Sequence, residues 1–163
     1  MTVSQEQFKQ AMGSFPTGVT VTTAYSETGE VVGMTASAFS SVSLDPLLVL
    51  MCPAKGAECY QPLTEASYFS IHLLAGDQSA LAWQFAKSDM DKTAGLEISQ
   101  GPGGSPKIHG CLAYLECRHH ALYDGGDHGI LVGEVTHIEF SDQERDPLVY
   151  CKSALGPLPA IGT

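Results

Sequence analysis

Residues 33–52, GMTASAFSSVSLDPLLVLMC, place a run of small and hydroxyl-bearing side chains directly before a short apolar run. The apolar run covers residues 47–51, and Asp45-Pro46 and Cys52-Pro53 bound it on either side. A short apolar run that ends at turn residues predicts a buried strand. The small residues before it lack the apolar alternation of an ordinary strand. They suit either a polar edge strand or the close approach of a flat ligand to the backbone.

Hairpin patterns surround this segment. Residues 19–25 alternate valine and threonine, residues 26–30 predict a turn, and a second strand begins at residue 31. We expect three short helices: one begins with a capping box at Ser4, one ends near Ala66, and one spans 77–87 with Asp77 as its N-cap. Strands in hairpins without regular βαβ alternation predict a mainly antiparallel β barrel with inserted helices. Further strands are predicted at 68–74, 111–119, 129–140 and 148–151.

The composition limits the class of protein. The chain has 163 residues, 44% of them hydrophobic, and we expect one domain over 1–155 with a surface tail over 156–163. The N-terminus lacks the basic region and apolar core of a secretory signal, and no apolar stretch is long enough for a membrane helix. We therefore expect a cytoplasmic protein. A formal charge of −10 disfavours binding to nucleic acid and to anionic membranes.

The sequence offers no evident metal site or nucleophile. The five cysteines form no CxxC pair, so we expect neither zinc nor another metal. Neither a GxGxxG fingerprint nor a P-loop is present, and no Ser-His-Asp or Cys-His arrangement can be assigned. An enzyme of this composition can still use a bound cofactor that supplies the chemistry.

Residues 125–129, GGDHG, form the sharpest local motif. Two glycines permit a tight turn, after which Asp127 and His128 stand at the start of the next strand. A histidine at such a junction can hydrogen-bond a ligand or change its charge near neutral pH. The alternative interpretation is a hairpin turn with a histidine that faces solvent.

Taken together, these segments resemble the short-chain NAD(P)H:flavin reductases, the reductase components of two-component flavin-dependent monooxygenases. The resemblance covers about residues 6–150. It rests on FPTGVTVTTA at 15–24, the segment 33–52, LAWQFAKSDMDK at 81–92, LAYLECRHHALYDGGDHGILVGEV at 112–135 and PLVY at 147–150. It implies the FMN-binding split barrel, an antiparallel Greek-key-type fold that forms a homodimer with flavin near the subunit interface.

The resemblance also implies an activity: hydride passes from NADH or NADPH to FMN or FAD, and the reduced flavin leaves for a partner monooxygenase. By position, Thr17, Gly18 and Val19 would lie beside the flavin, and Thr35, Ala36, Ser37 and Ala38 would contact its ring. The loop that begins at Cys52, with Lys55, Gly56 and Ala57, would meet the phosphate, and Lys92 would be a second phosphate contact. Asp127 and His128 would lie on the nicotinamide side, where His128 would orient the nicotinamide.

Two segments depart from the family's pattern. The loop at 53–59 reads PAKGAEC where relatives are rich in serine and threonine, and Glu58 would oppose a phosphate. After Tyr150 the chain continues CKSAL instead of a glycine and an aromatic residue. These departures fit a reductase that binds flavin loosely as a substrate. The alternatives are a flavoprotein that keeps FMN tightly bound for electron transfer or for another substrate, and a split-barrel haem binder that uses His119 or His120.

Overall fold

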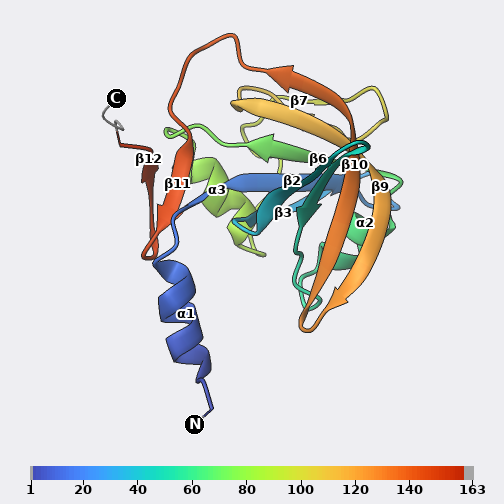
Figure 1. Cartoon of the computed structure of the whole chain (residues 1–163). Helices are drawn as coiled ribbons and strands as arrows, with labels where there is room; N and C mark the ends of the chain where they lie inside the picture. The colour runs from blue at the N-terminus through green and yellow to red at the C-terminus, as the bar shows by residue number, and fades with distance from the viewer. Residues whose placement is uncertain (1, 160–163) are drawn as a thin grey trace.

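The computed structural model describes residues 2–159 and is built mainly of antiparallel strands (Figure 1). This confirms the predicted mainly β class with inserted helices. In chain order, the elements are α1 (Gln5–Gly13), β1 (Thr17–Gly18), β2 (Thr20–Tyr25), β3 (Val31–Ala36), β4 (Phe39–Leu44), β5 (Leu47–Met51), α2 (Tyr60–Glu65), β6 (Tyr68–Leu73), α3 (Ser79–Ala86), β7 (Ile98–Gln100), β8 (Pro106–Ile108), β9 (Ala113–Gly125), β10 (His128–Phe140), β11 (Leu148–Cys151) and β12 (Ala154–Pro157).

The main sheet has seven strands in the order β3-β2-β6-β9-β10-β5-β4. Each neighbouring pair in it is antiparallel, and β3 and β4 form its two edges. The predicted run of small residues at 33–43 is divided between these two edge strands, with Ser37 and Ala38 at the bend between them. Because β5 pairs with both β4 and β10, the apolar run 47–51 is an internal strand of the sheet. The predicted strand is confirmed, but it is buried only in part: Val49 and Met51 are buried, whereas Leu47 is 48% exposed.

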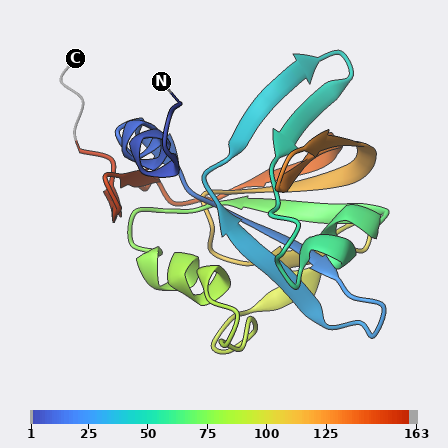
Figure 2. The same cartoon turned by 90° about the horizontal axis from the view of Figure 1, so that it is seen from below.

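A smaller sheet joins the two ends of the chain. It has the order β1-β11-β12, and Figure 2 shows it beside α1, away from the main sheet. The expected tail begins inside β12, since β12 pairs with β11 over 154–157 and so crosses the division placed at residue 155. Residues 160–163 of that tail lie outside the described part of the chain, and the domain boundary stays a prediction.

Helix α3 packs against β3, and a glycine makes this close packing possible. Leu81, Ala82 and Phe85 are its buried residues. A Cβ atom at Gly33 would lie 2.4 Å from the carbonyl oxygen of Thr22 and 3.2 Å from Cε1 of Phe85, so only glycine fits there. The predicted cap was wrong: the N-cap residue is Gln78, while the Asp77 carboxylate accepts a 3.5 Å hydrogen bond from Arg145.

Helix α1 begins where the sequence predicts. The Ser4 hydroxyl accepts from the Gln7 amide, and the Gln7 side chain accepts from the Ser4 amide, which completes the capping box. The helix has no buried side chain and projects from the body of the molecule in Figure 1. No helix among residues 2–159 is both long and apolar enough to cross a membrane, and the cytoplasmic location stays a prediction.

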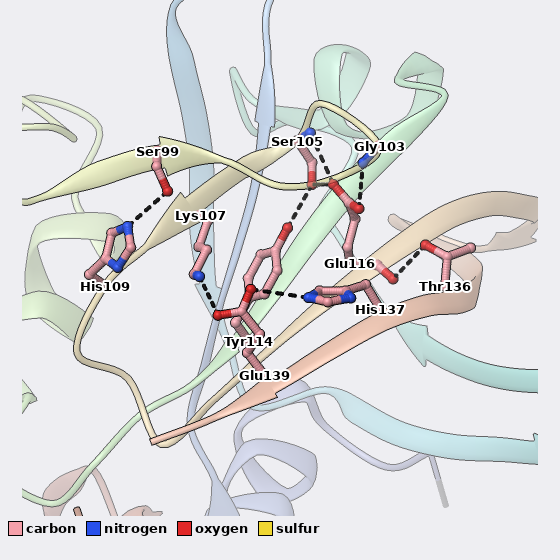
Figure 3. A network of polar contacts seen from close by, with 10 residues as sticks. All are labelled: Ser99, Gly103, Ser105, Lys107, His109, Tyr114, Glu116, Thr136, His137 and Glu139. Carbon is pink, nitrogen blue, oxygen red and sulfur yellow. Dashed lines mark hydrogen bonds and ion pairs between the residues drawn. The ribbon is translucent and has the colours of Figure 1, made fainter. Parts of the chain in front are cut away.

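A buried carboxylate fixes the base of the β9–β10 hairpin (Figure 3). Glu116 is only 1% exposed. It accepts hydrogen bonds from the Gly103 amide at 2.7 Å, the Ser105 amide at 3.2 Å and the Ser105 hydroxyl at 2.7 Å. Nearby, burial raises the pKa of Tyr114, whose hydroxyl lies 3.4 Å from that of Ser105. These contacts tie the loop between β7 and β8 to the main sheet.

Candidate active site

The structure has three neighbouring cavities. Residues of β3 and α3 line the first two, and residues 15–20 form much of the third. The first has a volume of about 610 Å³ and lies between β3, the loop 56–59 and the segment that follows α3. Four of the residues predicted from the resemblance line it: Thr35, Gly56, Ala57 and Lys92. The structure therefore brings together residues that are up to 57 positions apart in the sequence, from Thr35 to Lys92.

Two smaller cavities continue from the first. The second, of about 300 Å³, shares Thr35 and Ala86 with it and is lined also by Val19, Ser37, Ala82, Trp83, Tyr150 and Leu155. The third, of about 420 Å³, shares Val19 and Ser37 with the second and adds Thr17 and Gly18. Because neighbouring cavities share lining residues, the three adjoin one another and form one continuous surface.

Several residues that line the first cavity carry hydrogen-bond donors. The backbone amides of Gly56 and Glu58 make no hydrogen bond with any residue of 2–159, so they are available to an acceptor. The Lys92 ammonium donates to the carbonyl of Gln84 at 3.0 Å and to that of Lys87. An ammonium has three protons, so one donor remains for a ligand. Glu58 also lines this cavity, and its negative charge would oppose an anion bound there.

Small side chains and hydroxyl groups line the second cavity, which joins the other two. The Thr35 hydroxyl donates a 2.6 Å hydrogen bond to the Ala82 carbonyl, which ties β3 to α3 and leaves the hydroxyl oxygen as an acceptor. The Thr17 hydroxyl is buried and has no hydrogen-bond partner within residues 2–159. Such an orphaned polar atom beside a cavity is compatible with a ligand or ordered water there.

Several predicted site residues lie elsewhere. Ala36 is a member of the hydrophobic core, and neither Ala38 nor Cys52 lines the three cavities. Burial raises the pKa of the half-buried Cys52 thiol. Lys55 does not line the cavities either, because its ammonium pairs with the Asp124 carboxylate.

Asp127 and His128 form a separate polar cluster at the tip of the β9–β10 hairpin. Gly126 adopts a φ of 78°, which confirms the predicted glycine turn. The Asp127 carboxylate accepts a 2.7 Å hydrogen bond from Nδ1 of His128, and this contact lowers the pKa of Asp127. The neutral imidazole then carries its proton on Nδ1, and Nε2 is free to accept. Neither residue lines the three cavities.

Several cavity residues were not among the predicted site, and three of them form a distinct wall. Trp83, Tyr150 and Leu155 form an aromatic and aliphatic wall of the second cavity. The spacing of Leu81, Ala82 and Phe85 indicates which face of α3 is buried, and Trp83 lies off that face, 51% exposed. Helical periodicity could therefore have singled out Trp83, whereas no local signal places the 150–155 hairpin beside α3.

The model of the flavin reductase like domain matches residues 12–159. The chain belongs to this family. It is 42% identical over 158 residues to "FMN reductase (NADH) SmoA" of Agrobacterium fabrum. This match covers 94% of this chain and 86% of that protein. It is 34% identical over 148 residues to "Flavin-dependent monooxygenase, reductase subunit HsaB" of Rhodococcus jostii, covering 91% of this chain and 75% of that protein.

A solved structure of this flavin reductase family has the same fold. The structure of the Streptomyces globisporus NADH:FAD oxidoreductase SgcE6, in complex with NAD and FAD fragments, superposes with a TM-score of 0.88. It is 36% identical and covers 98% of this chain and 97% of that one. The family resemblance predicted from the sequence is thus confirmed over nearly the whole chain.

Proposed function

We propose that this chain is an NADH-dependent flavin reductase. It transfers a hydride from NADH to FMN or FAD and supplies the reduced flavin to a flavin-dependent monooxygenase component. The observation that carries the proposal is the first cavity, whose lining combines small side chains, Lys92 and two residues whose backbone amides have no partner within residues 2–159. The names of the relatives support it, since they include an NADH-dependent FMN reductase and a monooxygenase reductase subunit.

The donors on residues that line the first cavity suit the phosphate of a flavin nucleotide. The amides of Gly56 and Glu58 would donate to its oxygens, and Lys92 would supply a positive charge. Glu58 opposes this binding, since like charges repel. We therefore expect moderate affinity and release of the flavin after reduction.

The second cavity suits a planar ring. Trp83, Tyr150 and Leu155 give it an apolar wall, and Thr35, with Ser37, gives it a polar one. A flavin bound there supplies the hydride-accepting chemistry. The residues of this chain would exclude water from the ring and orient it, with Thr17 and Gly18 beside it in the third cavity.

His128 is proposed to orient the nicotinamide. Its hydrogen bond to Asp127 fixes the imidazole, and Nε2 can then accept from a donor on the nicotinamide side. Transfer of a hydride depends on close alignment of donor and acceptor, so a positioned contact is sufficient for this role. We assign His128 no proton transfer.

The proposed enzyme is a homodimer. Large apolar side chains are exposed along β4, β5 and β10, among them Leu44, 89% exposed, and Phe140, 78% exposed. Exposed apolar surface on adjacent strands is typical of an interface between subunits. Light scattering coupled to gel filtration would test this, and a monomer at micromolar concentration would contradict it.

The activity is tested by NADH and NADPH oxidation at 340 nm, with and without added FMN or FAD. We expect oxidation that requires added flavin, saturates with it and is faster with NADH. A protein that stays yellow after dialysis and oxidises NADH without added flavin would instead favour a tightly bound flavin. No oxidation in any combination would contradict the proposed activity.

A further inference from the structure

The segment that follows β5 faces two ways. Gly56, Ala57 and Glu58 line the first cavity, whereas Pro53, Ala54 and Lys55 contact the turn of the β9–β10 hairpin. One short stretch of chain thus connects the cavity to the cluster that carries Asp127 and His128. The ladder between β5 and β10 ends at the pair of Met51 and Leu131, so the contacts beyond it are separate from the ladder.

Three contacts join this segment to the hairpin tip. The Gly129 amide donates to the Pro53 carbonyl at 2.9 Å, and the Lys55 amide donates to the Asp127 carbonyl at 2.9 Å. These two hydrogen bonds flank Ala54 and His128 and make them an isolated antiparallel bridge. The third contact is between side chains: the Lys55 ammonium pairs with the Asp124 carboxylate.

We propose that Lys55 is a positioning residue: by pairing with Asp124 it holds the hairpin tip, and with it His128, at a fixed place relative to the flavin cavity. In this role Lys55 does not bind the flavin phosphate. The proposal rests on the proposed function for its kinetic consequence, although the contacts themselves do not.

The charges around Lys55 agree with this role. Its hydrogen bond to Asp124 raises the pKa of Lys55 and lowers that of Asp124, so both groups are charged at neutral pH. Asp127 adds a second negative charge nearby, which also raises the pKa of Lys55 and favours the present position of its ammonium. For Lys55 to reach a phosphate in the cavity, the ammonium would have to leave two carboxylates.

An exposed ion pair of this kind adds little to the free energy of unfolding of the whole protein. It can still be a large share of the interactions that hold a turn with few other contacts. The Asp124 side chain is largely exposed, and the tip lacks buried apolar residues to hold it. Without the pair, the tip would keep only its backbone contacts, and His128 would sample more positions. We expect about a threefold to fivefold increase in the KM for NADH, the fold-change that corresponds to a surface pair.

The test compares Lys55→Met with Asp124→Asn, the double variant and the charge swap Lys55→Asp/Asp124→Lys. We expect both single variants to raise the KM for NADH equally, the double variant to add nothing further, and the swap to recover part of the loss. The dissociation constant for FMN, measured by quenching of flavin fluorescence, should change by less than about twofold. Lys9→Met, which removes an exposed lysine from α1, controls for the loss of charge.

Two readouts do not require activity. In both single variants we expect faster hydrogen exchange at the amides of Lys55 and Gly129 and a shifted imidazole resonance of His128. Unchanged exchange and an unchanged resonance would overturn the proposal. So would a tenfold or greater loss of FMN affinity in Lys55→Met without a loss in Asp124→Asn, since that pattern marks a phosphate contact. Absence of NADH oxidation in the unmodified protein would contradict the proposed function alone and would leave the two structural readouts as the test.

Discussion

The two ends of β9 differ in how they are held. At its base, Ala113 to Cys117 are buried, and Glu116 collects three hydrogen bonds from the loop between β7 and β8. At its tip, Tyr123 is 59% exposed, and the turn is held by backbone contacts with Pro53 and Lys55 and by one surface ion pair. The base therefore supports the fold, and the tip can be repositioned at little cost in stability. A residue at the tip can serve a ligand for the same reason.

Removal of the Glu116 carboxylate should destabilise the base of the hairpin more than any other change considered. Glu116→Ala leaves the amide and the hydroxyl of the buried Ser105 without their acceptor, and it also removes the acceptor of the Gly103 amide. Because each unpaired buried group costs about 1–3 kcal/mol, we expect the free energy of unfolding to fall by about 3–5 kcal/mol. Urea denaturation measures this. Glu144→Ala, at an exposed position, is the control, and a loss no larger than that of the control would contradict the role of Glu116.

His72 lies beside the base and makes the fold sensitive to acid. It is fully buried, Nδ1 donates to the Val21 carbonyl at 3.0 Å, and Nε2 accepts from the Ile108 amide at 3.0 Å. Burial lowers its pKa from 6.5 to about 4. Above pH 6.5 the histidine is neutral in both the folded and the unfolded state. As the pH falls from 6.5 to 4, only the unfolded state gains the proton, so stability decreases.

The size of this decrease follows from the two pKa values. A difference of about 2.5 pH units corresponds to about 3 kcal/mol lost between pH 6.5 and 4. His72→Gln can keep one donor and one acceptor but cannot titrate, so its stability should depend less on pH over this range. Thermal unfolding measured from pH 7 to pH 4 compares the two proteins. Parallel pH profiles would show that His72 does not cause the acid sensitivity.

At the tip, Gly126→Ala should have a smaller effect. A Cβ atom at Gly126 would meet no heavy atom within 4 Å, so the cost comes from the φ of 78° alone. We expect a loss of about 1 kcal/mol in the free energy of unfolding. Gly156→Ala is the matched control, because its Cβ atom also has open space and its φ is not positive. Equal effects of the two substitutions would contradict a strained turn at Gly126.

Much of the fold could be predicted from local patterns. Valine and threonine alternation gave β2, the apolar run gave β5, and the paired glycines gave the turn at Gly126, because each depends on neighbouring residues only. The predicted N-cap of α3, Asp77, was wrong because its carboxylate accepts a hydrogen bond from Arg145, which is distant in sequence. Likewise, no pattern in the sequence joins Lys55 to Asp124. That contact depends on how β5 and the β9–β10 hairpin lie together.

The central claim is that the cavity and the hairpin tip hold different reactants. Lys92→Met and His128→Ala, measured in parallel, test it most directly. We expect Lys92→Met to weaken FMN binding about tenfold, since it removes a charge-assisted hydrogen bond of about 1.5 kcal/mol, with little change in the KM for NADH. His128→Ala should raise the KM for NADH and leave the FMN dissociation constant unchanged. If each variant changed both constants to the same extent, the two regions would act on the same reactant, and the account would be contradicted.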